Sequence, residues 1–198
     1  MTSSIAPDAE VGAAIRKWLE RAVIGLNLCP FAKAVLVKKQ IRYVVSRAKT
    51  EDALLDDLER ELKFLAEAAP VDVDTTLLIM PDVLSDFAAF VLFLDLAEVV
   101  LRSYGLNGIL QLASFHPGYV FAGAEPDDLA NYTNRAPYPI LHLLRESSLA
   151  RVVAACPDAA DIYERNIDTL RKLGLDGWRA LDVDTPPKKC AGNVLDEH

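Results

Sequence analysis

Residues 75–115 read TTLLIMPDVLSDFAAFVLFLDLAEVVLRSYGLNGILQLASF, and this stretch decides the class of the fold. Thr75–Met80 is a short run of β-branched and apolar residues that ends at a proline, which predicts a buried strand. Ser85–Tyr104 predicts a long helix with Ser85 as its N-cap and Gly105 as its C-terminal stop. An Asn-Gly turn then leads into the apolar run Ile109–Phe115, a second predicted strand. A strand, a helix and a further strand in this order predict a layered α/β domain.

The chain before this stretch adds a strand and two helices to the predicted fold. Residues 7–26 carry apolar side chains at helical spacing, and a second amphipathic helix follows its predicted N-cap, Thr50. Between these helices, Ile41–Ser46 predicts a strand, whereas Ala34–Val37 fits either its hairpin partner or an extended loop. The β-α-β-α-β order predicts a helix-rich α/β domain with a small, mostly parallel sheet of three to four strands.

The C-terminal third of the chain is predicted to be helical. Ile140–Glu146 begins a helical region, and Pro157 suits the first turn of a further helix that ends at Gly174. We therefore expect a single globular domain over residues 1–181, closed by N- and C-terminal helices. Residues 182–198 are polar and proline-containing, which predicts a flexible C-terminal tail.

Composition excludes several classes of protein. Hydrophobic residues make up 52% of 198 residues, enough for a core without disulfides or a structural metal. The net charge is −8 and no basic run exceeds two residues, which argues against nucleic-acid and anionic-membrane partners. The longest apolar run, Phe87–Leu101, contains Asp95 and Glu98 and is too short for a membrane span, so it predicts a buried helix.

The cysteines and the N-terminus predict a cytoplasmic protein. Cys29, Cys156 and Cys190 are odd in number and widely spaced, without a CxxC pair, which fits reduced thiols rather than disulfides or a zinc site. The first ten residues are polar and acidic and lack the apolar core of a signal peptide. The oligomeric state stays open.

The segment Ser114–Glu146 is the predicted functional site. It holds two of the three histidines and follows an apolar strand, and long polar loops in compact domains often bind ligands or carry catalytic groups. His116, at the carboxyl end of the strand, is the candidate general base or metal ligand; alternatively its ring bonds to a backbone carbonyl. Arg135 is a candidate anion clamp with Asn131 and Asn134 as orienting donors, although such side chains also stabilise loops.

A second candidate group lies at the end of this segment. On the predicted helix His142 and Glu146, four residues apart, share a face beside Arg145. This face is interpreted either as ligand-binding or as an internal hydrogen bond. A metal site using His116, His142 and Glu146 is a further alternative, although HxxxE is not a zinc-protease motif.

Cys29, which lies outside the segment Ser114–Glu146, is also assigned to the predicted site. It lies in LNLCPFAK at a predicted helix end, with Lys33 as a nearby cation. Cys29 is either a nucleophile paired with His116 or a buried, inert thiol in the pocket wall.

Five stretches of the chain resemble a known family. These are GLNLCPFAK, TTLL, ASFHPGYVFAG, PDDLANYTNRAPYPILHLLRE and ERNIDTLRKLG. Together they resemble the family called domain of unknown function 1415, over about residues 11–181. The resemblance implies a small soluble domain that is widespread in bacteria and plants, and it implies no activity.

Three alternative functions follow. The first is a small enzyme that acts on a small, anionic metabolite through His116, Arg135 and the asparagines, with Cys29 nearby. The second is a non-catalytic module that binds a ligand or a protein partner; a metal-binding protein is the third alternative. GxGxxG, GxxxxGK[ST], GxSxG and HExxH are all absent, so no nucleotide cofactor or serine hydrolase is indicated and the cofactor stays unknown.

Overall fold

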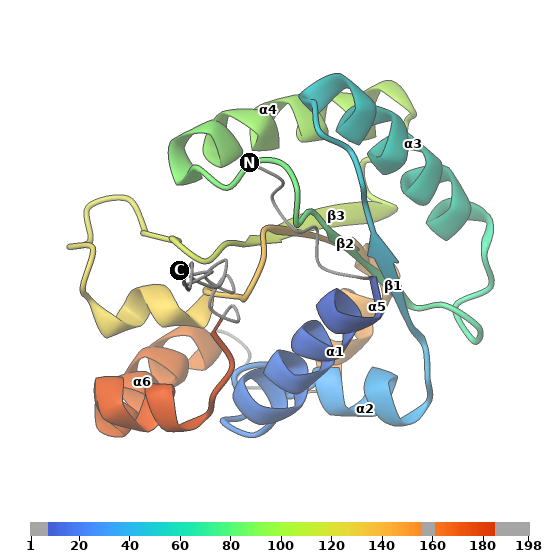
Figure 1. Cartoon of the computed structure of the whole chain (residues 1–198). Coiled ribbons are helices and arrows are strands. Elements are labelled where there is room, and N and C mark those ends of the chain that lie inside the picture. Colours follow the sequence, from blue (N-terminus) through green and yellow to red (C-terminus); the bar gives the residue numbers. More distant parts are fainter. Residues whose placement is uncertain (1–7, 156–160, 185–198) are drawn as a thin grey trace, which may run out of the picture.

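The structure is a computed structural model that describes residues 8–155 and 161–184, and its centre is a four-stranded sheet (Figure 1). The spatial order is β1 (Ile41–Val45), β2 (Thr75–Ile79), β4 (Ile140–Arg145) and β3 (Leu110–Phe115). β1 and β2 pair in parallel, whereas β4 runs antiparallel to both β2 and β3. Strands β1, β2 and β3 therefore point the same way, and β4 makes the sheet mixed. The predicted α/β class, the small sheet and the β-α-β-α-β order are confirmed.

One face of the sheet is covered by α3 (Glu51–Glu67) and α4 (Phe87–Ser103) (Figure 1). The leucines of α3 and the phenylalanines of α4 pack there against Leu78 of β2 and against β4. Thr50 caps α3 as predicted, because its Oγ1 accepts the Ala53 N–H at 3.3 Å. The cap of α4 is Asp86 rather than Ser85: Asp86 Oδ1 accepts the Ala89 N–H at 2.9 Å.

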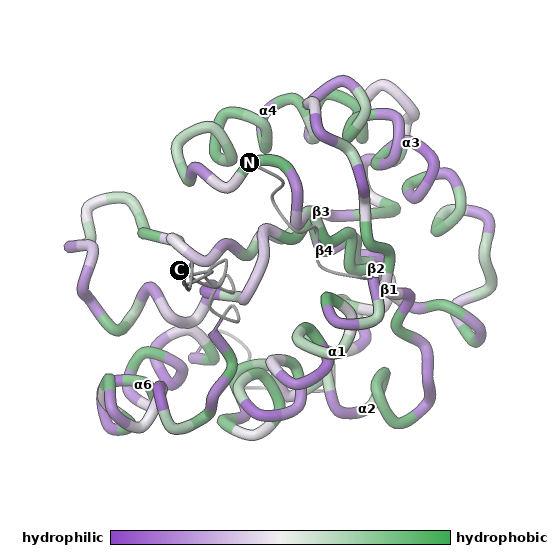
Figure 2. Tube along the Cα trace, in the orientation of Figure 1, coloured by the Kyte–Doolittle hydropathy of each residue, from purple (hydrophilic) through white to green (hydrophobic). Residues whose placement is uncertain are grey.

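The opposite face is covered by α1 (Asp8–Trp18), the π-helical turn η1 (Leu19–Ile24) and α2 (Ala32–Val37) (Figure 1). α6 (Ile162–Ala180) packs against the 3-10 turn η2 (Leu129–Thr133) in the loop after β3. α5 (Glu146–Ala155) follows directly on β4. Leu77 and Ile79 of β2 face this side, so β2 contributes to two cores and all five of its residues are buried. Figure 2 shows the hydrophobic strands of the sheet between two layers of helices, the arrangement expected of a three-layer domain.

The prediction of a helical region at Ile140–Glu146 is wrong, because residues 140–145 form the strand β4. Its side chains alternate between the two cores: Ile140 faces the α1 side, and Leu141 and Leu143 face α3 and α4. Short leucine-rich runs satisfy a helical and a strand pattern equally well. Both edges of β4 are paired, with β2 and with β3, and this pairing selects the strand.

Residues 34–37 are helical in the structure, so the prediction of a strand or extended loop is wrong there. They belong to α2, which begins two residues after Pro30 and packs Ala32 into the core. The β-branched residues that suggested a strand lie at half-buried or exposed positions of this short helix. Tertiary packing therefore overrides their strand propensity.

The C-terminal helix differs from its prediction at one end. Gly174 has a φ of 70° and kinks the chain, but helical structure continues to Ala180. Trp178, which follows the kink, is buried, so this last part of the helix still packs against the core. Pro157 lies outside the described residues, as does the predicted tail beyond Asp184.

Helix α4 is less enclosed than its composition predicts. Leu92 is 70% exposed and Val99 52% exposed, and Val91 and Leu96 are also exposed on the same helix. Only the face that carries Phe90 and Phe93 is fully buried against the sheet. No helix in the described part of the chain is both long and apolar enough to cross a bilayer.

Candidate functional site

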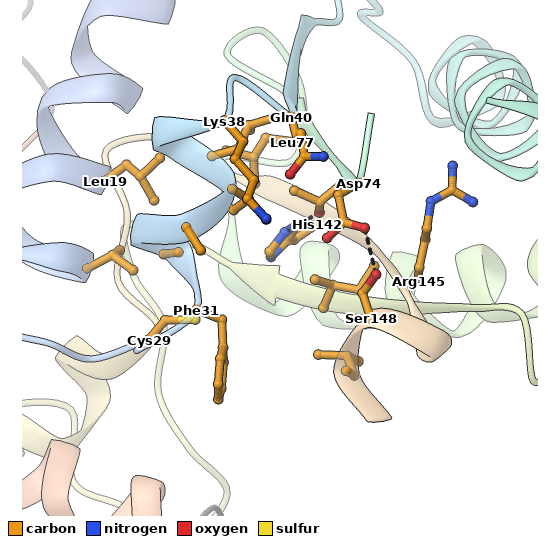
Figure 3. A pocket seen from close by; sticks show the side chains of 18 of the residues that line it. Leu19, Cys29, Phe31, Lys38, Gln40, Asp74, Leu77, His142, Arg145 and Ser148 are labelled. Carbon is orange, nitrogen blue, oxygen red and sulfur yellow. Dashed lines mark hydrogen bonds between the residues drawn. The ribbon is translucent and has the colours of Figure 1, made fainter. Parts of the chain in front are cut away.

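A cavity of about 610 Å³ lies against the sheet on the side of α1 and α2 (Figure 3). Its floor consists of side chains from all four strands, and its walls come from η1, the turn before α2, α2 itself, the turn before β2 and the start of α5. The floor residues are Ile41, Thr75, Leu77, Phe115, His142 and Leu144. The cavity is of the size that holds a small organic ligand.

The cavity has an apolar end and a polar end. Figure 3 shows Leu19, Cys29 and Phe31 together on one side, and Asp74 and Ser148 on the other. His142 lies between these groups in the same view. An amphipathic cavity of this kind selects a ligand with a hydrocarbon body and a polar or charged end.

His142 is held by a chain of hydrogen bonds from β2 to β4. The Thr75 hydroxyl donates to the Leu143 carbonyl at 2.7 Å, so it has no second proton to offer. At 2.6 Å from Thr75 Oγ1, the Nε2 atom of His142 must therefore carry the proton and donate it. The neutral ring is the Nε2–H tautomer, and Nδ1 keeps a free lone pair.

Nδ1 of His142 is open to the cavity. It has no hydrogen-bond partner among the described residues. Among the described residues, the fully buried polar side-chain atoms without a hydrogen-bond partner are Tyr43 Oη and Thr76 Oγ1. His142 Nδ1 is not one of them, so this unpartnered atom is accessible from the cavity. Burial of the ring lowers the pKa of His142 from 6.5 to about 4, so the ring is neutral near neutral pH.

The cavity carries more positive than negative charge. Lys38, Arg145 and Arg151 line it with one carboxylate, Asp74. Asp74 Oδ1 accepts the Ser148 hydroxyl at 2.6 Å and lies 3.9 Å from Arg151 Nη2. Lys38 has no ion-pair partner among the described residues, and Figure 3 shows its side chain directed into the cavity. The cavity is therefore suited to an anionic group beside Lys38.

Arg145 was predicted to bind a ligand, and it does line the cavity. Its guanidinium nevertheless faces the turn before β2, where Nη2 donates to Ala68 O at 2.6 Å and to Val73 O at 3.1 Å. Gln40 Nε2 binds the same turn through Pro70 O and Val71 O. Burial lowers the pKa of Arg145. Both side chains thus shape the cavity wall by holding this turn.

Cys29 and His116 do not meet. Cys29 lines the His142 cavity, beside Phe31 (Figure 3), whereas His116 is not among the residues that line it. Lys33 is exposed on α2 and does not line the cavity either. Cys29 is a free thiol; Cys156 and Cys190 lie outside the described residues.

His116 is buried with both ring nitrogens used. Its Nδ1 accepts the Gly118 N–H at 2.9 Å, so Nε2 carries the proton and donates to Leu84 O at 3.0 Å. The ring packs between Phe87 and Phe90 of α4, and burial lowers its pKa. His116 thereby ties the loop after β3 to the loop before α4.

The other polar residues of the loop after β3 bind its own backbone. Asn131 is fully buried; its Oδ1 accepts the Phe121 N–H and its Nδ2 donates to Glu125 O. Asn134 Nδ2 donates to Ser114 O at 3.1 Å. Arg135 donates to Tyr119 O and Pro126 O and lies 4.1 Å from the centre of the Tyr132 ring. These contacts hold a long loop in one shape.

Glu146 and His142 do not share a helical face. His142 lies on β4, and Glu146 is the first residue of α5, with its N–H bonded to Ile109 O. The predicted pairing on one helix is therefore wrong. Within residues 8–155 and 161–184, no three His, Cys, Asp or Glu side chains are grouped closely enough to hold a metal, so His116, His142 and Glu146 do not form the alternative metal site.

The predictions from sequence omit several residues of the cavity. These are Lys38, Asp74, Thr75, Ser148 and Arg151. One signal was present: in ILHLLR, His142 is the only residue that interrupts an apolar run on a buried strand. The five omitted residues come from three separate segments, and no local pattern connects them.

The comparisons with known proteins identify a family. No curated protein and no solved structure matches the chain. A family model described as "Protein of unknown function (DUF1415)" matches residues 10–180, a range that includes all four strands and all residues lining the His142 cavity. The resemblance seen in the sequence is thereby confirmed, and the chain belongs to this family of proteins of unknown function.

Proposed function

We propose that this protein is an enzyme that acts on a small organic anion bound in the His142 cavity, with His142 as the proton acceptor. The observation that carries the proposal is the open Nδ1 of a neutral histidine inside an amphipathic cavity that the unpaired Lys38 also lines. A cytoplasmic setting belongs to the same proposal, and the free thiol of Cys29 is compatible with it.

The charges of the cavity favour an anion. Lys38 and Arg151 line the cavity with one carboxylate, Asp74, and the Arg145 guanidinium is bonded to the turn before β2, so one positive charge is in excess in a chain whose net charge is −8. The unpartnered Lys38 ammonium is the natural partner of a carboxylate or phosphate, and the Arg151 guanidinium lines the same cavity.

The state of His142 suits acid–base chemistry. A general base must be unprotonated at the working pH, and burial keeps this ring neutral. Thr75 fixes the ring, so the basic atom has a defined position in the cavity. This proposal assigns the acid–base role to His142 instead of His116, whose two nitrogens are both bonded to backbone.

The binding step is tested with Lys38→Met and a matched control, Lys33→Met. Both variants remove one exposed lysine from the α2 region, but only Lys38 lines the cavity. Small amphipathic carboxylates and phosphates are titrated into each protein by calorimetry. We expect Lys38→Met to weaken binding about tenfold, the value of one lost charge-assisted contact, and Lys33→Met to bind as the wild type does.

The catalytic step is tested with His142→Gln. The amide N–H of glutamine can still donate to Thr75, but the side chain offers no basic nitrogen. Each anion that binds is followed by NMR for conversion; we expect turnover by the wild type and none by the variant, with binding retained. Equal binding by the two lysine variants, or turnover that survives in His142→Gln, contradicts the proposal.

A second candidate function is self-association through α4. Leu92, Leu96 and Val99 form an exposed stripe with the spacing at which helices interdigitate. Asp95, Glu98 and Arg102 on the same helix provide both signs of charge, so the same surface can pair with itself across a two-fold axis between copies of this chain. Light scattering after gel filtration tests it: we expect a dimer that Leu92→Glu converts to a monomer. A wild type that stays monomeric at high concentration contradicts this candidate.

A further inference from the structure

We infer that the ligand of the His142 cavity is an apolar hydroxy acid, whose hydroxyl lies close to its anionic group and donates a hydrogen bond to His142 Nδ1. This inference rests on the proposed function and narrows its substrate class. It also assigns Thr75 as the positioning residue that makes Nδ1, rather than Nε2, the atom that faces the ligand.

The first step is the direction of the hydrogen bonds. The Leu143 carbonyl only accepts, so the Thr75 proton goes there at 2.7 Å, and the 2.6 Å contact to His142 is donated by Nε2–H. β2 and β4 are paired along their whole length, which fixes the Thr75 and Leu143 backbones relative to each other. The ring cannot offer an N–H to the cavity without losing this bond. A ligand atom that contacts Nδ1 must therefore be a donor.

The second step is the cost of an unsuitable ligand. The walls beside His142 include Leu77, Phe115 and Leu144, which offer no hydrogen-bond donor from their side chains. A ligand that displaces water from Nδ1 without replacing its hydrogen bond leaves a desolvated acceptor, which weakens binding by about tenfold or more. Donor and non-donor ligands are discriminated strongly by sites of this type.

The third step is the order of groups along the ligand. Figure 3 shows the Lys38 side chain reaching towards His142 from the side of Leu19, with Leu19 and Phe31 on one side of His142 and Asp74 and Ser148 on the other. The ligand accordingly carries its anionic group and its donor close together, and its hydrocarbon group extends towards Leu19 and Phe31. A hydroxyl satisfies this arrangement; a cationic ammonium at the same place would be repelled by the Lys38 ammonium.

The inference is tested first without ligand. The chain has three histidines, so ¹⁵N-histidine labelling gives a simple spectrum, and His142→Gln assigns the His142 signals. We expect a pyridine-type Nδ1 and a pyrrole-type Nε2 in the wild type. Thr75→Val, which keeps the shape of the side chain and removes its oxygen, should give a mixture of tautomers. A protonated Nδ1 in the neutral wild-type ring overturns the inference.

The second test uses three probes with one carbon skeleton: phenyllactate, its O-methyl ether and phenylpropanoate. We expect phenyllactate to bind at least about tenfold more tightly than the other two, and only phenyllactate to shift the Nδ1 resonance. Thr75→Val should lose this preference, whereas Ser148→Ala, a change at the polar end of the same cavity, should keep it. Equal binding of all three probes, still weakened by Lys38→Met, overturns the hydroxyl assignment and leaves the proposed function standing. Failure of all three to bind contradicts the proposed function itself.

Discussion

Replacing His142 by glutamine removes the titration of a buried imidazole and keeps a side-chain N–H for Thr75. The unfolded chain binds this proton with the ordinary pKa of 6.5, whereas the folded chain binds it with a pKa of about 4. The folded pKa is depressed, so protons bind preferentially to the unfolded state and acid destabilises the fold. The contribution of His142 to stability is complete above the unfolded value and is lost as the pH falls from 6.5 towards 4.

The size of the effect follows from the two pKa values. At 1.36 kcal/mol per pH unit, the loss is about 1.4 kcal/mol at about pH 5.5 and about 3.4 kcal/mol well below pH 4. Urea unfolding of both proteins at about pH 7.5 and about pH 5.5 measures it, and both values stay above the isoelectric point of 4.9. We expect the wild type to lose about 1.4 kcal/mol more than His142→Gln between the two conditions. Because the other titrating groups are common to both proteins, their contributions cancel in this difference. Free energies of unfolding that change in parallel would refute the assignment of a buried, neutral His142.

Three further predictions concern the frame around the site, and urea unfolding checks each of them. Arg42→Met should lower the free energy of unfolding by about 3 kcal/mol, because Glu61 is 2% exposed and would lose the guanidinium that binds it at 2.7 Å. A decrease no larger than that caused by breaking a surface ion pair, below about 1 kcal/mol, would contradict this prediction. Asp86→Ala should cost about 1 kcal/mol and Ser85→Ala almost nothing, since Asp86 is the cap of α4; the reverse order would show that Ser85 is the cap. Asn131→Ala should cost about 2 kcal/mol by leaving the Phe121 N–H without its acceptor, and proteolysis should become faster within residues 116–138; unchanged proteolysis would contradict a loop held by Asn131.

The elements with strong local signals were predictable. Leu54, Leu58 and Leu62 recur at helical spacing behind a threonine cap, and α3 forms there as predicted. The short apolar runs at Thr75–Ile79 and Leu110–Phe115 form strands as predicted, because a proline ends the first and an Asn-Gly turn precedes the second. In these stretches periodicity, propensity and boundary residues all favour one structure.

The elements with short, ambiguous signals were not predictable. ILHLLR satisfies both a helical and a strand pattern. It forms a strand because it pairs with β2 on one side and with β3 on the other. Residues 34–37 suggest a strand, yet they form part of the helix α2, in which Ala32 is buried in the core. Such choices depend on partners that are distant in the sequence.

The candidate site, like the fold, was predictable only in part. The amino-acid sequence by itself determined the α/β class, the family, and the two segments around Cys29 and His142, because these depend on residue type and local order. Only the tertiary structure decided which histidine faces a cavity. His142 on strand β4 faces the cavity on the α1 and α2 side of the sheet, whereas His116 is enclosed by α4 and Leu84. The direction of a side chain depends on strand pairing and on what packs against it, and neither is written in the local sequence.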